Sequence, residues 1–557
     1  MITKHNFKEM LKTIGFVEEH DNLYVKCFKK RPLQVDFTNQ KLIYPENTHH
    51  NKDNPNGITI HERQTCNFSQ NENFVVFECI ARLLEKGYKP EHIEIEPKWP
   101  MGRGSKGGRA DILIRNHQQE LIIIECKTAK EHDKAWQQTL EYGGQLFTYI
   151  RQAQNTQYGV LYSSDFVDGK IKYRNEIITF IDNKVFLEKS AENIARKTYE
   201  TANSTEEIFQ VWKNTYYQDY QTRGFLEDDI SAYHIAKKKY TIADLVHLDY
   251  RDIQKKYHAF ATILRKYNVS GRENAFDKLV NLFLCKLVDE SKNTLNEADE
   301  LKFYWKGATV DNAFDLQDRL ELLYQEGMQK FLKEEVTYIN DEQVDQAFRF
   351  FKNDPDATKK TIQHYFKQLK FFTNNDFAFI DVHNEKLFYQ NFAVLLEVVR
   401  LFQDISLRTN SDNQFLGDLF EGFLDQGIKQ SEGQFFTPMP IVRFIVSALP
   451  LQEIIKTAKN TQPKVIDYAC GSGHFLNEYA KQIQSLLKND TTLKKYYQNI
   501  YGIEKEYRLS KVAKVSTFMY GQEEVEILYS DALSQNDKIK DSSFSVLIAN
   551  PPSLPLN

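Results

Sequence analysis

The chain has no long apolar run, few cysteines and no strong excess of charge of one sign. No uninterrupted apolar stretch approaches the roughly 20 residues that a membrane helix needs, and the amino-terminal residues lack the apolar core of a signal peptide. The six cysteines, Cys27, Cys66, Cys79, Cys126, Cys285 and Cys470, form no CxxC pair and have no metal-ligand spacing. These absences predict a cytoplasmic protein with reduced thiols, no zinc site and no membrane partner.

The composition excludes further classes. A formal net charge of -5 gives no global attraction for polyanions, so binding to nucleic acid would have to come from local basic patches. Hydrophobic residues at 41% and charged residues at 27% are typical of a folded globular chain and not of a disordered one. A Walker phosphate loop is missing, so ATP-driven translocation is not encoded. At 557 residues the chain is too long for one core, and three or four domains are expected.

Hydrophobic periodicity divides the chain into ranges of different character. Helices and strands alternate at both ends of the chain, whereas strand signals nearly vanish in the middle. We expect a multidomain α/β protein with a small β-containing lead-in (1–60), an α/β domain (61–190), a helical linker (191–250), an all-α domain (251–428) and a doubly wound sheet (429–557).

The segment GRADILIRNHQQELIIIECK carries a first group of chemically active side chains. Asp111 stands at the start of one predicted strand, and Glu125 and Lys127 are two residues apart on the next, so they point to the same face. Two carboxylates can hold Mg²⁺, and a nearby lysine can orient water or stabilise charge on phosphorus. The alternative is a hairpin with two solvated charges at its end. Because the apolar run LIII delivers Glu125 from a buried strand, a partner charge or a metal is expected.

This segment resembles the PD-(D/E)xK nuclease superfamily, and more closely the amino-terminal nuclease domain of Type I restriction subunits and Type IIG restriction-modification enzymes. The resemblance implies a restriction-endonuclease-like core that binds Mg²⁺ through Asp111, Glu125 and a carboxylate from the preceding helix. Glu72 and Glu78 are the candidates for that third carboxylate, with Glu72 placed in the metal set, and the sequence does not choose between them.

A Gln-x-x-x-Tyr helix follows the catalytic lysine in many nucleases of that superfamily. This chain offers Gln145 and Tyr149, with a second register at Gln138 and Tyr142. The first register is preferred because QLFTY leads directly towards the next strand, and the alternative is an ordinary amphipathic helix face.

Upstream of Asp111, the segment KWPMGRGSKGGRAD places Lys98, Arg103, Lys106 and Arg109 among glycines. A basic loop of this kind can contact DNA phosphates without selecting a sequence. It can equally be a solvated loop.

The segment VIDYACGSGHF contains the strongest motif in the chain. A buried strand ends at Asp467, a glycine-rich turn follows, and a helix starts at once, which lets a ligand approach the backbone amides closely. Glu504 and Asp531 stand at the ends of two further strands, where Glu504 is suited to bind a ribose diol. Each acid alone could be a helix cap, but three successive strand ends favour a ligand site.

The carboxy-terminal section resembles the N6-adenine DNA methyltransferases, particularly the Type I modification subunit and the Type IIG branch. The resemblance implies a Rossmann-like fold that binds S-adenosylmethionine. By residue, it implies contacts with the methionine end from Phe435, Thr437, Pro438, Asp467, Gly471 and Gly473, with the ribose from Glu504 and with the adenine from Asp531.

Asn550, Pro551 and Pro552 match the catalytic Asn/Asp-Pro-Pro-aromatic motif of that family. There the asparagine side chain and a proline carbonyl accept hydrogen bonds from the amine of a flipped adenine. The fourth position is Ser553 here, so a stacking contribution of ~1 to 3 kcal/mol is missing. The sequence also stops before the remaining strands of the sheet and before a target-recognition domain, which argues against methylation by this chain alone.

Together these motifs predict a truncated or split restriction-modification protein: a Mg²⁺-dependent deoxyribonuclease fused to an adenine-specific DNA methyltransferase. Its expected partners are double-stranded DNA and a separate chain that supplies the rest of the sheet and a recognition domain. The alternatives are a catalytically silent DNA-binding or assembly component, and a modification subunit with a vestigial amino-terminal domain. The sequence does not encode the recognition site, the cut position or the oligomeric state.

Overall fold

The computed structural model describes most of the chain. The described residues are 1–28, 31–47, 57–97, 99, 109–116, 119–153, 156–184, 186–187, 197–228, 230–235, 239–248, 250–293, 299–308, 310–338, 365–366, 369–370, 375–408, 437–457, 462–487, 490–540 and 542–551. They include most, but not all, of the predicted site residues. Phe435, Pro552 and Ser553 lie outside them, as do Lys98, Arg103 and Lys106 of the basic segment.

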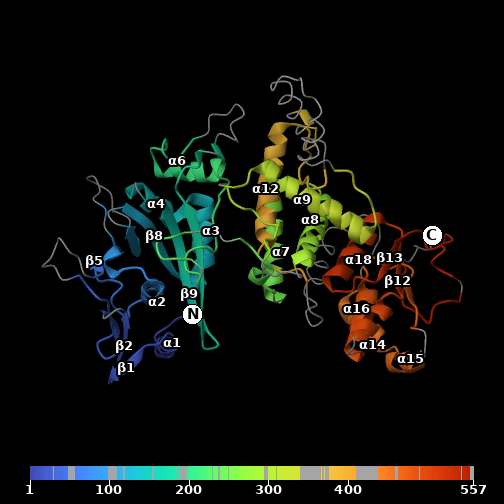
Figure 1. Cartoon of the computed structure of the whole chain (residues 1–557), viewed down its shortest axis with the longest axis horizontal. Helices are drawn as coiled ribbons and strands as arrows, with labels where there is room; N and C mark the ends of the chain where they lie inside the picture. The colour runs from blue at the N-terminus through green and yellow to red at the C-terminus, as the bar shows by residue number, and fades with distance from the viewer. Residues whose placement is uncertain are drawn as a thin grey trace, which may run out of the picture. The chain divides into compact units, whose positions relative to one another are not determined.

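The chain forms two compact units (Figure 1). The first contains Met1–Lys238 together with Lys306–Asn312, and the second contains Lys239–Trp305 and Ala313–Asn557. The short return segment belongs to the first unit because Ala308 donates its backbone amide to the Asp219 carboxylate and accepts from the Asn183 side chain. The five finer domain ranges expected from periodicity remain predictions.

Two sheets and several helices make up the first unit. A four-stranded antiparallel sheet has the order β1-β2-β3-β4, and a six-stranded mixed sheet has the order β10-β9-β8-β7-β6-β5. The elements are α1 (Phe7–Thr13), β1 (Val17–His20), β2 (Leu23–Phe28), β3 (Arg31–Asp36), β4 (Lys41–Ile43), β5 (Thr59–Ile60), α2 (Asn71–Lys86), β6 (Ile93–Ile95), β7 (Ile112–Asn116), β8 (Gln119–Thr128), α3 (Ala129–Tyr142), α4 (Gly144–Gln152), β9 (Tyr158–Val167), β10 (Lys170–Thr179) and α6 (Thr205–Gln210).

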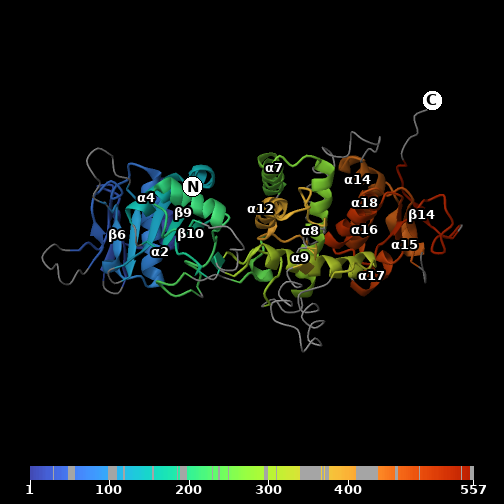
Figure 2. The ribbon, with the colours of Figure 1, turned by 90° about the horizontal axis from the view of Figure 1, so that it is seen from above.

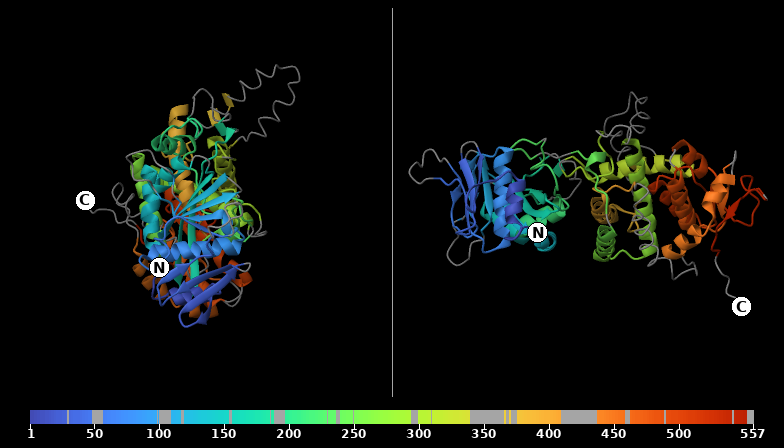
Figure 3. Two further views of the ribbon diagram at one scale, coloured as in Figure 1. Left: turned by 90° about the vertical axis from the view of Figure 1, so that its left-hand side faces the viewer. Right: turned by 90° about the horizontal axis from the view of Figure 1, so that it is seen from below.

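The six-stranded sheet is buried on both faces, which explains the apolar run in β8. Ile122, Ile124 and Cys126 pack into the core that contains α2 and the amino-terminal residues, whereas Ile123 packs into a second core under α3 and α4. Figure 3 shows the blue helix α2 against this fan of strands. Because side chains alternate along a strand, Glu125 and Lys127 share the face of Ile123. Residues of α1, β2, β3 and β4 therefore lie in the same core as residues of α2 and β8.

Helices dominate the first half of the second unit (Figure 2). They are α7 (Tyr250–Lys266), α8 (Arg272–Asn293), α9 (Ala313–Gly327) and α12 (Glu385–Phe402). Polar contacts join α8 to helix α18 (Tyr507–Met519). The buried Lys511 Nζ lies 2.5 Å from Asn281 Oδ1, and the partly exposed Arg508 Nε lies 2.9 Å from an Asp277 carboxylate oxygen. Burial lowers the pKa of Lys511 to about 8. In the part of the chain that the structure describes, no helix is long and apolar enough to cross a bilayer.

The second unit ends in a parallel sheet with the order β13-β12-β11-β14. Its strands are β11 (Val465–Asp467), β12 (Ile500–Glu504), β13 (Glu526–Tyr529) and β14 (Val546–Leu547), and the helices around them are α14 (Met439–Ser447), α15 (Leu451–Thr457), α16 (His474–Leu486), α17 (Asp490–Tyr497) and α18. β11 lies between β12 and β14. The strands that follow β11 in the chain are therefore placed first on one side of it, as β12 and β13, and then on its other side, as β14. In open α/β sheets such a switch point, at the carboxyl ends of the strands, is where ligands bind.

Candidate functional site

The first candidate site lies in the first unit, at the end of the six-stranded sheet where β7 begins and β8 ends. Asp111 directly precedes β7, and its carboxylate accepts a 2.7 Å hydrogen bond from the Cys126 amide near the end of β8. Lys127 Nζ lies 2.7 Å from Glu125 Oε1 and 3.4 Å from Glu72 Oε1. The antiparallel pairing of β7 with β8 brings Asp111 to Glu125 and Lys127, and the ion pair with Lys127 brings Glu72 of α2 to the same end of the strands.

The charges at this edge oppose one another. Burial raises the pKa of Asp111 well above its ordinary value, and the negative charges of Glu125 and Glu72 raise it further. Burial also raises the pKa values of Glu125 and Glu72, while Lys127 lowers both. For Lys127 itself burial acts to lower the pKa, but Glu125 and Glu72 raise it above the ordinary value. The site thus concentrates three carboxylates around one ammonium group.

The structure separates the two candidates for the carboxylate on α2. Glu72, in the first turn of α2, reaches Lys127. Glu78 is buried and is already satisfied, because Arg82 donates to one of its oxygens at 2.5 Å and the Tyr162 hydroxyl donates to the other at 2.6 Å. Glu72 is therefore the acid that lies beside the predicted catalytic residues.

The Gln-x-x-x-Tyr pair divides in the same way. Tyr149 on α4 is 3% exposed, and it is close enough to Glu125 to lower the pKa of that carboxylate. Burial followed by the charge of Glu125 raises the pKa of Tyr149. Gln145, one turn earlier on α4, is exposed. In the other register Tyr142 is 75% exposed. Of the two candidate tyrosines, only Tyr149 is therefore buried.

The donor set at this edge suits a hard divalent cation chemically. Glu125 Oε2 is buried without a hydrogen-bond partner, and an unsatisfied carboxylate oxygen among other carboxylates is the type of ligand that Mg²⁺ takes. Among the described residues, no three His, Cys, Asp or Glu side chains are grouped so as to hold a metal ion. Lys127 instead supplies the positive charge between Glu72 and Glu125.

The second candidate site lies at the carboxyl edge of the parallel sheet in the second unit. Asp467 ends β11, and its carboxylate accepts from the Ala469 amide at 3.1 Å. Glu504 ends β12, and its carboxylate accepts from the Gly471 amide at 2.9 Å. Gly471 and Gly473 both have positive φ, 53° and 84°, so glycine supplies the left-handed turn that brings the two strand ends together.

Burial dominates the electrostatics of this second site. It raises the pKa of Asp467 to about 7, and the nearby charge of Glu504 adds to that rise. Burial also lowers the pKa of His474, the first residue of α16, to about 4. At neutral pH this end of the sheet therefore holds a neutral imidazole at His474 and, at Asp467, an acid whose pKa is about 7.

Asp531, after β13, is placed differently. Lys505 Nζ lies 2.8 Å from the Asp531 carboxylate, and this hydrogen bond lowers the pKa of Asp531. The sequence argument missed Lys505, although its place directly after the Glu504 strand end was a usable signal. Only the parallel pairing of β12 with β13 shows that the two side chains face each other.

The structure also brings together two segments that the sequence separates by more than 100 residues. Asn550, which follows β14, donates from Nδ2 to Thr437 Oγ1 at 2.9 Å. Thr437 directly precedes Pro438, the N-cap residue of α14. Asn550 and Pro551 are both exposed, and thus open to a ligand.

The carboxy-terminal segment is similar to known proteins. Residues 411–553 match the family model described as N-6 DNA Methylase. The methylase subunit of the type I restriction enzyme MjaVII from Methanocaldococcus jannaschii is 30% identical over 166 residues, which make up 29% of this chain and 26% of that protein. The chain thus spans about a quarter of the curated relative it matches. The matched residues all lie in the second compact unit, and the match leaves the first compact unit outside it.

Solved structures of related systems align weakly. The methyltransferase subunit of a type I restriction-modification system from Streptococcus thermophilus is 13% identical, with 54% of this chain and 63% of that chain covered and a TM-score of 0.30. A DrdV–DNA complex is 13% identical, with 82% and 38% covered and a TM-score of 0.22. TM-scores of this size do not establish a shared fold.

Proposed function

We propose that the second unit binds S-adenosylmethionine and belongs to an adenine-N6 DNA modification system of the restriction-modification type. The observation that carries the proposal is the meeting of Asp467, Gly471 and Glu504 at the switch point of a parallel sheet, inside the segment that matches N-6 DNA methylases. When bound, S-adenosylmethionine supplies an electrophilic methyl group.

The residues of this edge have distinct roles in the proposal. Glu504 accepts hydrogen bonds from the ribose diol in place of the Gly471 amide, which then becomes free to approach the cofactor. Asp467, Thr437, Pro438, Gly471 and Gly473 surround the methionine end, and Asp531 accepts from the adenine amine. Asn550 Oδ1 and the Pro551 carbonyl accept from the amine of a flipped target adenine, while Asn550 Nδ2 donates to Thr437. Double-stranded DNA and further subunits are the proposed partners.

Cofactor binding tests this proposal directly. Titration calorimetry of the full chain is expected to show binding of S-adenosylmethionine, and Glu504→Ala is expected to weaken it by roughly 10- to 100-fold, since hydrogen bonds to a charged group contribute about 1.5 to 3 kcal/mol. Glu524→Ala removes an exposed carboxylate that precedes β13 and serves as the matched control. A wild-type chain that gives no binding, or equal losses in both variants, contradicts the proposal.

We infer a second activity, Mg²⁺-dependent phosphodiester cleavage, for the first unit. It is supported by Asp111, Glu125, Glu72 and Lys127 at one sheet edge and by the unsatisfied Glu125 oxygen. Asp111, Glu125 and Glu72 would hold Mg²⁺, which when bound neutralises charge on the phosphate. Lys127, which lies 2.7 Å from Glu125 Oε1, then orients the attacking water.

Cleavage of plasmid DNA tests the second activity. Asp111→Ala and Lys127→Ala are each expected to abolish Mg²⁺-dependent cleavage by the full chain. Asp133→Ala and Lys130→Ala change exposed residues of α3 and are the matched controls, so both should cleave like the wild type. Cleavage that survives in both Asp111→Ala and Lys127→Ala would show that this edge is not the nuclease site.

A further inference from the structure

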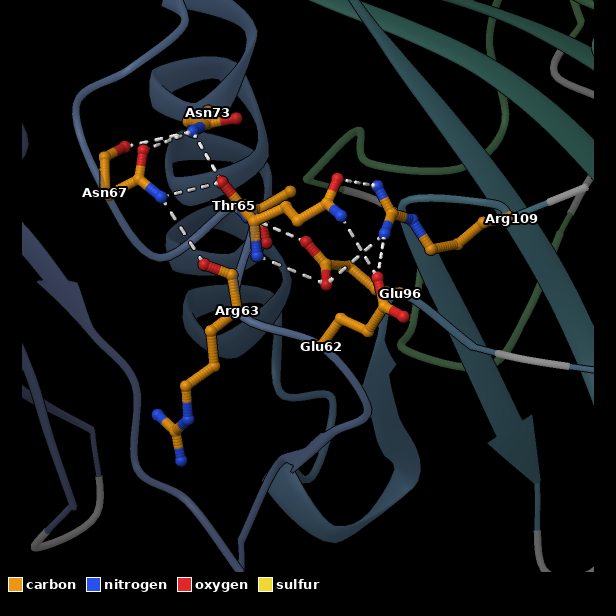
Figure 4. A network of polar contacts seen from close by, with 8 residues as sticks. Glu62, Arg63, Thr65, Asn67, Asn73, Glu96 and Arg109 are labelled. Carbon is orange, nitrogen blue, oxygen red and sulfur yellow. Dashed lines mark hydrogen bonds and ion pairs between the residues drawn. The ribbon is translucent and has the colours of Figure 1, made fainter.

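A network of charged residues beside the first candidate site has no role in the chemistry described so far. Figure 4 shows its members Glu62, Thr65, Glu96 and Arg109, and Gln64 joins them through a hydrogen bond with Arg109. Arg109 stands two residues before Asp111, and Glu62 and Gln64 lie in the segment that leads to α2 and Glu72. The network therefore connects two of the segments that deliver the proposed catalytic carboxylates.

Arg109 is held by side chains and not by the core. Its guanidinium forms an ion pair with Glu62, donates to Gln64 Oε1 at 2.6 Å and lies 4.0 Å from Glu96 Oε2. The arginine side chain remains 31% exposed. A planar guanidinium at a surface is a geometry that also binds phosphate oxygens in pairs.

Glu96 is the buried residue that anchors this network. It is fully buried, and its carboxylate accepts from the Thr65 amide at 2.7 Å. Its own amide donates to the Asp111 carbonyl at 2.9 Å. Glu96 adopts a φ of +54°, a left-handed conformation that a residue with a side chain rarely takes. Strained backbone of this kind persists where the surroundings hold it and is frequent at functional sites.

The charge of Arg109 also acts on a side chain of the first candidate site. Burial and the charge of Glu125 raise the pKa of Tyr149, and the positive charge of Arg109 acts in the opposite direction. Arg109 is thus close enough for its charge to act on Tyr149. In the free protein, however, its charge is neutralised by Glu62 and Glu96.

We propose that Arg109 is a positioning residue for the DNA backbone, which exchanges its ion pair with Glu62 for a phosphate next to the cleaved bond. The proposal rests on the nuclease function inferred above. Glu62 acts as a placeholder that keeps the guanidinium extended beside Asp111, and the buried Glu96 keeps the base of the network in place after the exchange. The partner chemistry is a phosphodiester of duplex DNA.

The salt dependence of DNA binding tests the proposal, because each phosphate contact changes the slope of log affinity against log salt by about 0.9. Binding of a fluorescent duplex to the full chain is measured without Mg²⁺. Arg109→Ala is expected to weaken binding about tenfold at low salt and to reduce the slope by about one. Arg109→Gln, which keeps a donor towards Glu62, should show the same loss of slope if Arg109→Ala does not fold. Glu62→Gln frees the guanidinium and is expected to tighten binding with the slope unchanged.

Arg63 provides the matched control. It lies next to Glu62, but its guanidinium points away from the network and pairs with Glu46 at 2.6 Å (Figure 4). Arg63→Ala should therefore leave the slope unchanged. A purely structural network would instead make Arg109→Ala and Glu62→Gln weaken binding alike and leave both slopes as in the wild type, and this result overturns the proposal.

Cleavage kinetics separate this proposal from the one on which it rests. If the wild type cleaves and Arg109→Gln raises KM with little change in kcat, Arg109 contributes to DNA positioning as proposed. If the wild type cleaves and Arg109→Gln keeps both KM and slope, the proposal for Arg109 fails while the nuclease assignment stands. If the wild type does not cleave with Mg²⁺, the nuclease assignment fails, and with it the place of Arg109 beside a cleaved bond.

Discussion

Single residues at both candidate sites gain their properties from burial. Glu125, Asp111 and Asp467 are acids at strand ends, and in each case burial is the largest cause of a raised pKa. Taking a carboxylate out of water costs free energy unless a positive partner is present. Lys127 fills that role for Glu125. For Asp467 the described residues offer the Ala469 amide and no ion pair, so the acid remains suited to a positively charged ligand.

Asp467 should make the stability of the second unit depend on pH. Its pKa is about 7 in the folded protein against an ordinary value of 3.8, so the folded state binds more protons between these values. Stability contributed by this group is therefore full below about pH 4 and falls as pH rises towards 7. Relative to wild type, Asp467→Asn is expected to gain stability over that window, on the order of 1 to 3 kcal/mol.

Chemical denaturation of both proteins between pH 4.5 and 8 measures this difference. The two curves should converge at the acidic end and separate towards neutral pH. A stability difference that stays constant over the whole range would show that Asp467 does not titrate there.

In the second unit, the packing of α16 against the parallel sheet depends on one glycine. Gly502, in the middle of β12, lies between its parallel neighbours β11 and β13. A Cβ atom there would lie 2.7 Å from Leu476 Cδ1, 2.8 Å from Ile527 Cδ1 and 2.9 Å from Cys470 Sγ. The absence of a side chain thus allows α16 to pack against the strand that delivers Glu504.

Gly502→Ala is expected to destabilise the protein by about 1 to 3 kcal/mol, because overpacking a filled core forces side chains and backbone to shift. Weakened binding of S-adenosylmethionine should accompany it, since the shift displaces Glu504. Thermal unfolding and calorimetry measure the two effects.

Leu476→Val removes the atom that the new methyl group would meet first, so it provides the control. The double variant should be more stable than the sum of the two single changes predicts. Simple additivity would contradict the proposed contact between the added methyl group and Leu476.

At the scale of the whole molecule, each compact unit has its own core and its own candidate chemistry. Hydrophobic periodicity predicted a change from mixed to helical structure near residue 190, and the described helices α7, α8, α9 and α12 agree with a helical middle region. Periodicity did not predict that residues 306–312 return to the first unit. That return depends on hydrogen bonds at Asp219 and Asn183, which no local pattern encodes.

Sequence alone determined which chemistry to look for. The period-two spacing of Glu125 and Lys127, the glycine-rich turn after Asp467 and the strand-end position of Glu504 are local features, and local geometry is enough to place each on a strand or turn. The match of residues 411–553 to N-6 DNA methylases agrees with the class of protein that the glycine-rich turn after Asp467 predicted.

Tertiary structure decided which residues meet. Glu72 rather than Glu78 reaches Lys127, Tyr149 rather than Gln145 is buried, and Asn550 contacts Thr437. Arg109 and Glu96 gain a shared role only through the loop that leads to α2. These contacts join residues far apart in the chain, and such pairs are set by sheet register and by the packing of helices on the sheet. The spacing of residues along the sequence carries no information about either.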